Sequence, residues 1–256
     1  MYGYGTFLEL SNKADTLIQL VTHFNDYSEY SYEDGHLQEI ISKFYNLKTL
    51  KIYPSCYGPF DYKYHNLEVL QIGYILIDTI TCIIKSSGGR LRKILINEYD
   101  IYEDKFYENT LILIRTIYEN CPLVEYLSLI FSPSNQHFSE FEILLQTCQR
   151  LKVLLLETES LCAKKRFMSG EKLSHALVRS APKSLREIGI FYQFKFSPKT
   201  LEEFSEGWKG RPAITILAPD HDYKEEKYTK IIDKYKVDGV IKNFLCGFLI
   251  DFIFDY

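Results

Sequence analysis

Apolar residues recur along the chain in a short unit of the form L-x-x-L-x-L. Clear copies begin at Leu47, Leu67, Leu91, Val124, Leu151 and Leu185, and weaker copies begin at Gly5 and Arg211. Alternation of apolar and other residues within the unit predicts a short strand with one buried face. Successive units begin 20 to 42 residues apart, so the chain is built from internal repeats.

A second pattern stands ahead of most of these strands. Apolar or small residues at i, i+3, i+4 and i+7 predict an amphipathic helix. In four places the i+7 residue lies three positions before the next unit, and these residues are Phe44, Cys121, Cys148 and Trp208. Further helices are predicted over 77–84, ended by a Ser-Ser-Gly-Gly run, and over 173–180.

The first part of the chain departs from this regular alternation. The gap between the units at Gly5 and Leu47 is long enough for two helices, which we expect around 13–25 and 36–45. The segment 53–66 contains two prolines and a glycine, so it is predicted to be a loop.

The pattern also explains two of the six cysteines. Cys121 and Cys148 each occupy the last inward position of a predicted helix, where a small apolar side chain fits,. A buried thiol of this kind is usually inert. We therefore expect both cysteines to be structural and not reactive.

One strand and one helix cannot bury their apolar stripes alone, but stacked repeats can. A period of about 20–30 residues is the signature of a leucine-rich-repeat protein. The sequence thus predicts an α/β leucine-rich-repeat solenoid, a right-handed horseshoe with parallel strands on the concave face and helices on the convex face. We expect about seven or eight repeats over 1–221, followed by a helix and apolar tail over 222–256.

Composition and charge narrow the function. The chain has 256 residues, of which 46% are hydrophobic, and a net charge of −4. A negative net charge does not favour the binding of nucleic acid, which is itself a polyanion. No C-x-x-C pair, zinc-finger spacing, signal peptide or apolar stretch long enough to span a membrane occurs,. A cytoplasmic or nuclear protein is the simplest expectation.

No catalytic motif stands out in the sequence. The strongest alternative is the run Asp220-His221-Asp222, which could hold a metal ion but follows a predicted strand directly and reads better as a turn,. We therefore expect no enzyme activity, no cofactor and no metal site.

The cysteine-led repeats "NCPLVEYLSL" and "TCQRLKVLLL", with the endings "SAPKSLREIGI" and "EEFSEGWKGRPAITI", resemble the F-box/leucine-rich-repeat proteins of the expanded fungal type. The resemblance covers about residues 5–243. It implies that the repeats capture a substrate protein for a cullin–RING ubiquitin ligase. In that family an upstream F-box binds the adaptor Skp1, and no F-box is recognisable in this sequence. Skp1 is thus expected only if an F-box lies upstream. A scaffold without a ligase connection, or self-association through the strand near 7–10, stays open.

Alternation places every second strand residue on the concave face, where a partner protein would bind. The later strands gather apolar and aromatic residues there, and an exposed patch of this kind marks an interaction site. The candidate partner-binding residues are Lys93, Leu95, Asn97, Tyr126, Ile130, Val153, Leu155, Glu157, Glu187 and Phe191. Alternatively, a C-terminal helix with Tyr228, Ile231, Ile232 and Tyr235 on one side covers this face, although we expect it to cap the last repeat.

Overall fold

The computed structural model describes residues 16–23, 44–53, 64–73, 77–97, 105–130, 132–157, 163–191 and 194–246. The chain divides into two compact units, Met1–Val124 and Glu125–Tyr256. Each unit is an α/β structure, and each is described by itself.

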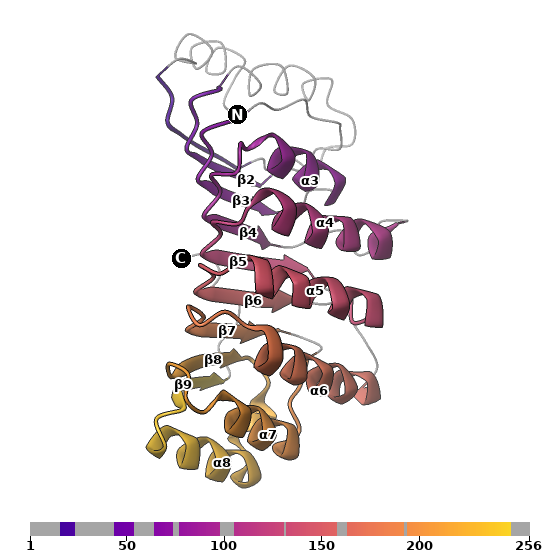
Figure 1. Ribbon diagram of the computed structural model, residues 1–256, viewed down its shortest axis with the longest axis vertical. Helices are drawn as coiled ribbons and strands as arrows, with labels where there is room; N and C mark the ends of the chain where they lie inside the picture. The colour runs from indigo at the N-terminus through magenta and orange to yellow at the C-terminus, as the bar shows by residue number, and fades with distance from the viewer. Residues whose placement is uncertain are drawn as a thin grey trace. The chain divides into compact units, whose positions relative to one another are not determined.

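The first unit contains a parallel sheet whose strands follow one another in chain order (Figure 1). Its strands are β1 (Gln19–His23), β2 (Thr49–Tyr53), β3 (Val69–Gly73) and β4 (Lys93–Asn97). Helices α3 (Ile77–Ser86) and α4 (Phe106–Asn120) pack against each other on one side of these strands. Each of β2, β3 and β4 begins two residues after the start of a predicted unit.

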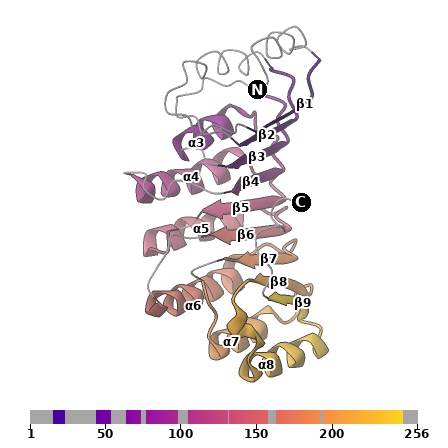
Figure 2. The same ribbon diagram turned by 180° about the vertical axis from the view of Figure 1, so that it is seen from behind.

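The second unit repeats the arrangement, again with parallel strands in chain order (Figure 2). Its strands are β5 (Tyr126–Ile130), β6 (Val153–Glu157), β7 (Glu187–Ile190), β8 (Ile214–Ala218) and β9 (Ile241–Cys246). Its helices are α5 (Asn135–Thr147), α6 (Ala163–Ser180), α7 (Pro198–Trp208), the short 3-10 helix η1 (His221–Lys224) and α8 (Glu226–Val237). The predicted helices over 77–84 and 173–180, and those ending at Cys121, Cys148 and Trp208, are confirmed.

The three-residue offset between helix end and strand unit has a direct structural cause. In each case the N–H of the first residue of the unit donates to the carbonyl of the residue three positions earlier. The N···O distance is 3.2 Å from Val124 to Cys121 and 3.1 Å from Leu151 to Cys148. The same bond joins Leu47 to Phe44 and Arg211 to Trp208. This turn satisfies backbone groups that the end of a helix leaves without partners.

Neighbouring repeats are joined by a second recurring bond. In several units the carbonyl of the second residue accepts two successive N–H groups from the next repeat. Glu125 accepts from Lys152 at 2.8 Å and from Val153 at 3.1 Å, and the carbonyl of Lys152 does the same for the repeat after it. In the first unit the carbonyl of Lys48 accepts from Glu68 and Val69. A bond set repeated at equivalent positions is what stacked repeats require.

The apolar positions of the unit form the core between strands and helices. Leu151 and Leu154 are fully buried and Leu156 is 1% exposed. Each such leucine contributes about 1.5–3 kcal/mol when removed from water. The helix residues predicted to face inward, such as Phe141 of α5 and Phe204 of α7, are also fully buried. The inward side chains of the strands and of the helices therefore form one apolar layer.

The prediction of a helix around 13–25 is wrong for the part that the structure describes, because Gln19–His23 is strand β1, paired in register with β2. Leu17, Leu20 and Thr22 are in fact a further copy of the repeat unit, with threonine at its last position. The adjacent apolar residues Ile18 and Val21 gave the segment the look of a helix face. Ile18 is 58% exposed, so its apolar side chain is not part of the core.

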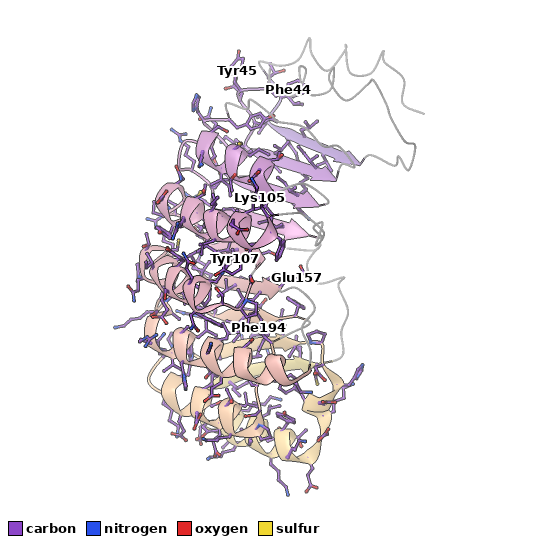
Figure 3. The ribbon with its side chains drawn as sticks, turned by 90° about the vertical axis from the view of Figure 1, so that its right-hand side faces the viewer. Phe44, Tyr45, Lys105, Tyr107, Glu157 and Phe194 are labelled. Atoms are coloured by element: carbon purple, nitrogen blue, oxygen red, sulfur yellow. The ribbon has the colours of Figure 1, made fainter. Side chains whose placement is uncertain are left out.

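Several other expectations fall mainly outside the described residues. These are the unit beginning at Gly5, the exposed strand near 7–10, the helix around 36–45 and the loop over 53–66. The described ends of two of these segments are informative. Phe44 and Tyr64 each occupy the turn position before a strand, and they are 1% and 0% exposed. Figure 3 labels Phe44 in the turn ahead of β2.

The end of the second unit continues the alternation beyond the predicted boundary at 221/222. Helix α8 packs against α7 and β9, and its residues Tyr228, Ile232 and Tyr235 are buried. Strand β9 then pairs in parallel with β8, with an irregularity beside Ile214. The first part of the predicted apolar tail is thus a strand of the sheet, and residues after 246 lie outside those described.

Candidate protein-binding face

The predicted binding residues lie on the side of the strands opposite the buried leucines, which we call the binding face. In the second unit the register aligns Tyr126 with Val153 and Val153 with Glu187. One step along the strands, Leu155 aligns with Gly189, and Gly189 with Leu217 of β8. Equivalent positions of neighbouring repeats therefore adjoin, as the sequence predicted.

The apolar residues of this face form a cluster of their own. Val153, Leu155, Phe191 and Leu217 pack together, with Tyr126 and Leu245 partly buried against them. The expectation that this patch is exposed is wrong, because Leu155 is 2%, Phe191 8% and Val153 9% exposed. These three side chains are a second core of the unit and are not open to a partner.

Phe191 shows how the face is partly filled from within. It follows the last residue of β7, and its N–H donates to the carbonyl of Leu156 at 2.9 Å. Its ring lies against Gly189: a Cβ added there would stand 2.6 Å from Cε2 of Phe191 and 2.8 Å from Cδ2 of Leu155. Glycine at 189 therefore leaves the space that the phenylalanine ring occupies.

Polar residues border the apolar cluster. Glu157 ends β6 and Glu187 begins β7, and both are partly exposed, as is Tyr126. Figure 3 labels Glu157 at the end of its strand. Ile130 pairs in register with Glu157, but its side chain is outside the described part of the structure. Of the predicted residues in this unit whose side chains are described, Tyr126, Glu157 and Glu187 are thus the ones with exposed surface.

The binding face of the first unit is different in character. Lys51 aligns with Gln71 and Gln71 with Leu95, while Val69 aligns with Lys93. Leu95 is 1% exposed and Gln71 is 1% exposed, whereas Lys51 and Lys93 are partly exposed. Asn97 aligns with Gly73, and its side chain lies outside the described residues.

Two features mark Gln71 and its surroundings. The Oε1 atom of Gln71 is buried and has no hydrogen-bond partner. Burial, and secondarily the charge of Lys51, lowers the pKa of Lys93. The ammonium groups of Lys51 and Lys93 thus lie near enough to repel each other. Lys51 and Gln71 were not among the predicted binding residues, although both stand at face positions of their units.

The acidic run near the end of the second unit binds a lysine of the chain itself. Asp220 caps η1, and its Oδ1 accepts from the N–H of Asp222 at 2.9 Å. Both carboxylates form ion pairs with the ammonium of Lys195, whose Nζ lies 2.8 Å from Oδ2 of Asp220. No group of His, Cys, Asp and Glu suited to a metal ion occurs among the described residues. The cation between these carboxylates is therefore a side chain.

Sequence reasoning missed Lys195, although a signal was present. It is a single charge between Phe194 and Phe196, and all three residues are buried. Figure 3 labels Phe194 in the connection between β7 and α7. A lone lysine in an apolar run implies a buried partner, but nothing in the sequence identified the two aspartates.

The cysteines behave as their positions predicted. Cys121 and Cys148 are fully buried at the ends of α4 and α5. Burial raises the pKa of the Cys148 thiol to about 12, so its reactive thiolate is scarce at neutral pH.

The chain matches no protein-family model and no curated protein sequence. None of the helices in the described ranges is long and apolar enough to cross a membrane.

Proposed function

We propose that the chain is a leucine-rich-repeat protein that binds another protein through the binding face. Its support is the recurrence of the same strand, turn and inter-repeat hydrogen bonds at equivalent positions. Stacked repeats of this kind present adjacent strand residues as one continuous surface. Such a surface binds without chemistry, so the proposal includes no catalytic role.

The exposed part of the face, and not its apolar cluster, is the part that contacts the partner. In the second unit Glu157, Glu187 and Tyr126 border the buried residues Val153, Leu155 and Phe191. The buried centre fixes the shape of the face, and the border supplies contacts that discriminate between partners.

The resemblance to F-box/leucine-rich-repeat proteins gives this function a particular form. We propose that the partner is a substrate selected for ubiquitination, with Skp1 bound where an F-box is present in the full protein. The alternative is a cytoplasmic or nuclear repeat scaffold without a ligase connection. Co-purification of Skp1 with the natively expressed protein separates the two, since a scaffold recovers its partner and no Skp1.

The face itself is tested with charge reversals. The full chain and its Glu157→Lys and Glu187→Lys variants are expressed with an affinity tag, and bound proteins are identified by mass spectrometry after cross-linking. We expect a reproducible partner whose recovery falls at least tenfold in both variants. Glu203→Lys is the matched control, since this glutamate lies on α7 with its side chain 46% exposed. Equal recovery with all three variants would reject the binding face.

A further inference from the structure

We propose that residues 247–256 of the chain itself cover the apolar centre of the binding face in the second unit. These residues lie outside the described part of the structure, and we call them the strap. The inference goes beyond the proposed function, because it assigns the centre of the face to the chain itself and leaves the polar border to a partner. Its support lies in the burial of the face, the position of β9 and the sequence of the strap.

The centre of the binding face is buried, although the helices α5 to α8 all lie on the other side of the strands (Figures 1 and 2). Leu155 aligns with Ser128 on β5 and with Gly189 on β7, so its neighbours along the sheet are small. Leu155 and Ser128 are nevertheless each 2% exposed. Phe191 covers Gly189 but lies two strands away from Ser128. Because a sheet buries a face by packing against another layer, this burial requires a further segment over the row.

The end of β9 brings the chain to the edge of this buried centre. Leu245 aligns with Leu217 and packs against the apolar cluster of the face. Strand β9 ends one residue later at Cys246, so the strap begins beside the cluster. Strands lie about 4.8 Å apart, and the distance from β9 to β5 is therefore about 19 Å,. The strap spans about 33 Å when extended, which is long enough to cross all of these strands.

The sequence of the strap predicts an extended segment with one apolar side. Residues at alternate positions are apolar or aromatic, namely Phe248, Ile250, Phe252, Phe254 and Tyr256. The positions between them include Asp251 and Asp255, which an extended conformation places on the opposite side. Alternation of this kind is typical of a segment with one buried and one exposed side. The strap therefore has the side chains that a layer over the apolar cluster requires.

Covalent attachment favours the strap over a separate molecule as the cover. A short connection keeps a segment at an effective concentration of roughly millimolar at a neighbouring surface. The strap follows β9 directly at the edge of the cluster. A second copy of the chain, or another protein with an apolar segment, has to compete with it from its own lower concentration. The strap is therefore the occupant that the position of β9 supports.

The first experiment measures the access of a reagent to the face. Val153→Cys places a thiol of similar size on β6, and its modification by iodoacetamide at neutral pH is followed by peptide mapping. We expect slow labelling at position 153, since the reaction needs an accessible thiolate. Labelling becomes about tenfold faster when Phe252→Asp and Phe254→Asp put charges on the apolar side of the strap.

The matched control changes the other side of the strap. Asp251→Asn combined with Asp255→Asn leaves the labelling rate at position 153 unchanged. Cys148, which is fully buried at the end of α5, stays unlabelled as long as the unit is folded. Unchanged labelling with the charged strap would overturn the inference, and faster labelling in Phe191→Ala would then assign the closure to that ring.

The second experiment needs no charged variant and decides the question if that variant unfolds. Phe252 is replaced by p-benzoylphenylalanine, a larger aromatic residue, and the protein is irradiated at low concentration. We expect cross-links within one molecule to the segments of β5 to β8. Cross-links to the helices α5 to α8 would overturn the inference. Products of twice the mass that increase with protein concentration would also overturn it, since they assign the cover to a second copy.

These outcomes are distinguishable from those of the proposed function, because neither experiment contains a partner. If both experiments fail, the charge reversals Glu157→Lys and Glu187→Lys still decide whether the border binds a partner. If those reversals keep the cellular partner while labelling and cross-linking give the expected results, the strap stands and the proposed function falls.

Discussion

The Nζ of Lys195 lies 2.8 Å from Oδ2 of Asp220, and the lysine side chain is 8% exposed. The bond ties the connection between β7 and α7 to the start of η1. A second bond joins the same two segments, since the N–H of Phe196 donates to the hydroxyl of Tyr223 at 2.8 Å. The last helix and strand of the second unit are therefore fixed to the repeat before them by polar contacts as well as by packing.

Replacing Lys195 with methionine tests this connection. The substitution keeps the length of the side chain and leaves two carboxylates without their cation. We expect a loss of about 1–3 kcal/mol in the free energy of unfolding, less than for a fully buried pair because the Asp222 side chain is 55% exposed,. Urea denaturation followed by circular dichroism measures it. An equal loss in Lys199→Met, at an exposed surface position, would contradict a specific role.

The same pair predicts a pH dependence. Burial lowers the pKa of Lys195, whereas its hydrogen bonds to Asp220 and Asp222 and the charges of these carboxylates raise it. The second effect is larger, so the pKa is raised above the ordinary 10.5. A raised pKa in the folded state stabilises the fold below the unfolded value and loses that effect as pH rises through the folded value. We expect the stability difference between the parent and Lys195→Met to be constant near neutral pH and to shrink above about pH 10.5,. A difference that shrank on acidification to pH 6 alone would contradict this.

Gly170 in α6 lies against the backbone of the same connection. A Cβ added at 170 would stand 2.0 Å from the carbonyl oxygen of Lys195, which is backbone and has little room to move. Although alanine favours a helix by about 1 kcal/mol over glycine, we expect Gly170→Ala to destabilise the protein by at least about 2 kcal/mol. The comparison is Gly207→Ala in α7, whose Cβ would stand 2.6 Å from Cγ1 of Val178. Because this neighbour is a partly exposed side chain and not backbone, we expect a smaller loss than for Gly170→Ala. Thermal melts of both variants decide the point.

Arg211 joins one repeat to the end of the previous helix. Its guanidinium donates to the carbonyls of Ala181 and Val178, both at 2.9 Å, and lies over the ring of Trp208 with 4.7 Å to the centroid. Arg211→Met should lower the free energy of unfolding by about 1–3 kcal/mol, because two helix-end carbonyls lose their donors. The fluorescence of Trp208, the one tryptophan in the chain, reports the unfolding of this region.

A lysine at this position provides the comparison. It keeps the charge but lacks the planar fork that reaches both carbonyls. We expect Arg211→Lys to recover less than half of the stability lost in Arg211→Met. Full recovery would show that charge alone matters there.

The cysteines predict a pattern of chemical labelling. Cys82 is exposed on α3, whereas Cys121 and Cys148 are fully buried. In the native protein, iodoacetamide at neutral pH should modify Cys82 and leave the other two unmodified, since the reaction needs an accessible thiolate. Peptide mapping by mass spectrometry measures this, and labelling in urea is the control in which all three react. Rapid native modification of Cys148 would contradict a structural role.

Much of the fold could be predicted because the helical and the strand periodicity recur at a fixed distance from each other in each repeat. The buried positions Leu151, Leu154 and Leu156 and the turn residue Cys148 all follow from that register. Two strands, β1 and β9, were not predicted. In β1 the unit ends in Thr22 and not in an apolar residue, and the pairing of β9 with β8 contains an irregularity. Gly239, with φ of 70°, follows α8 as Gly210, with φ of 80°, follows α7, and this similarity was the sequence signal for β9.

The candidate site was less predictable. Alternation correctly placed Val153, Leu155 and Glu187 on one face, but it could not show that the first two are buried there. Exposure depends on what packs over a residue, and Phe191 reaches back over Gly189 from beyond the strand.

The sequence alone determined the succession of parallel strands and helices, because these depend on local periodicity and on the hydrogen bonds of a short turn. Only the tertiary structure decided which polar groups meet. The pairing of Lys195 with Asp220 and Asp222 joins residues that lie more than 20 positions apart in the chain. Ion pairs and hydrogen bonds act over a few ångströms in space, so a pattern along the chain predicts that a buried charge needs a partner but not which residue supplies it.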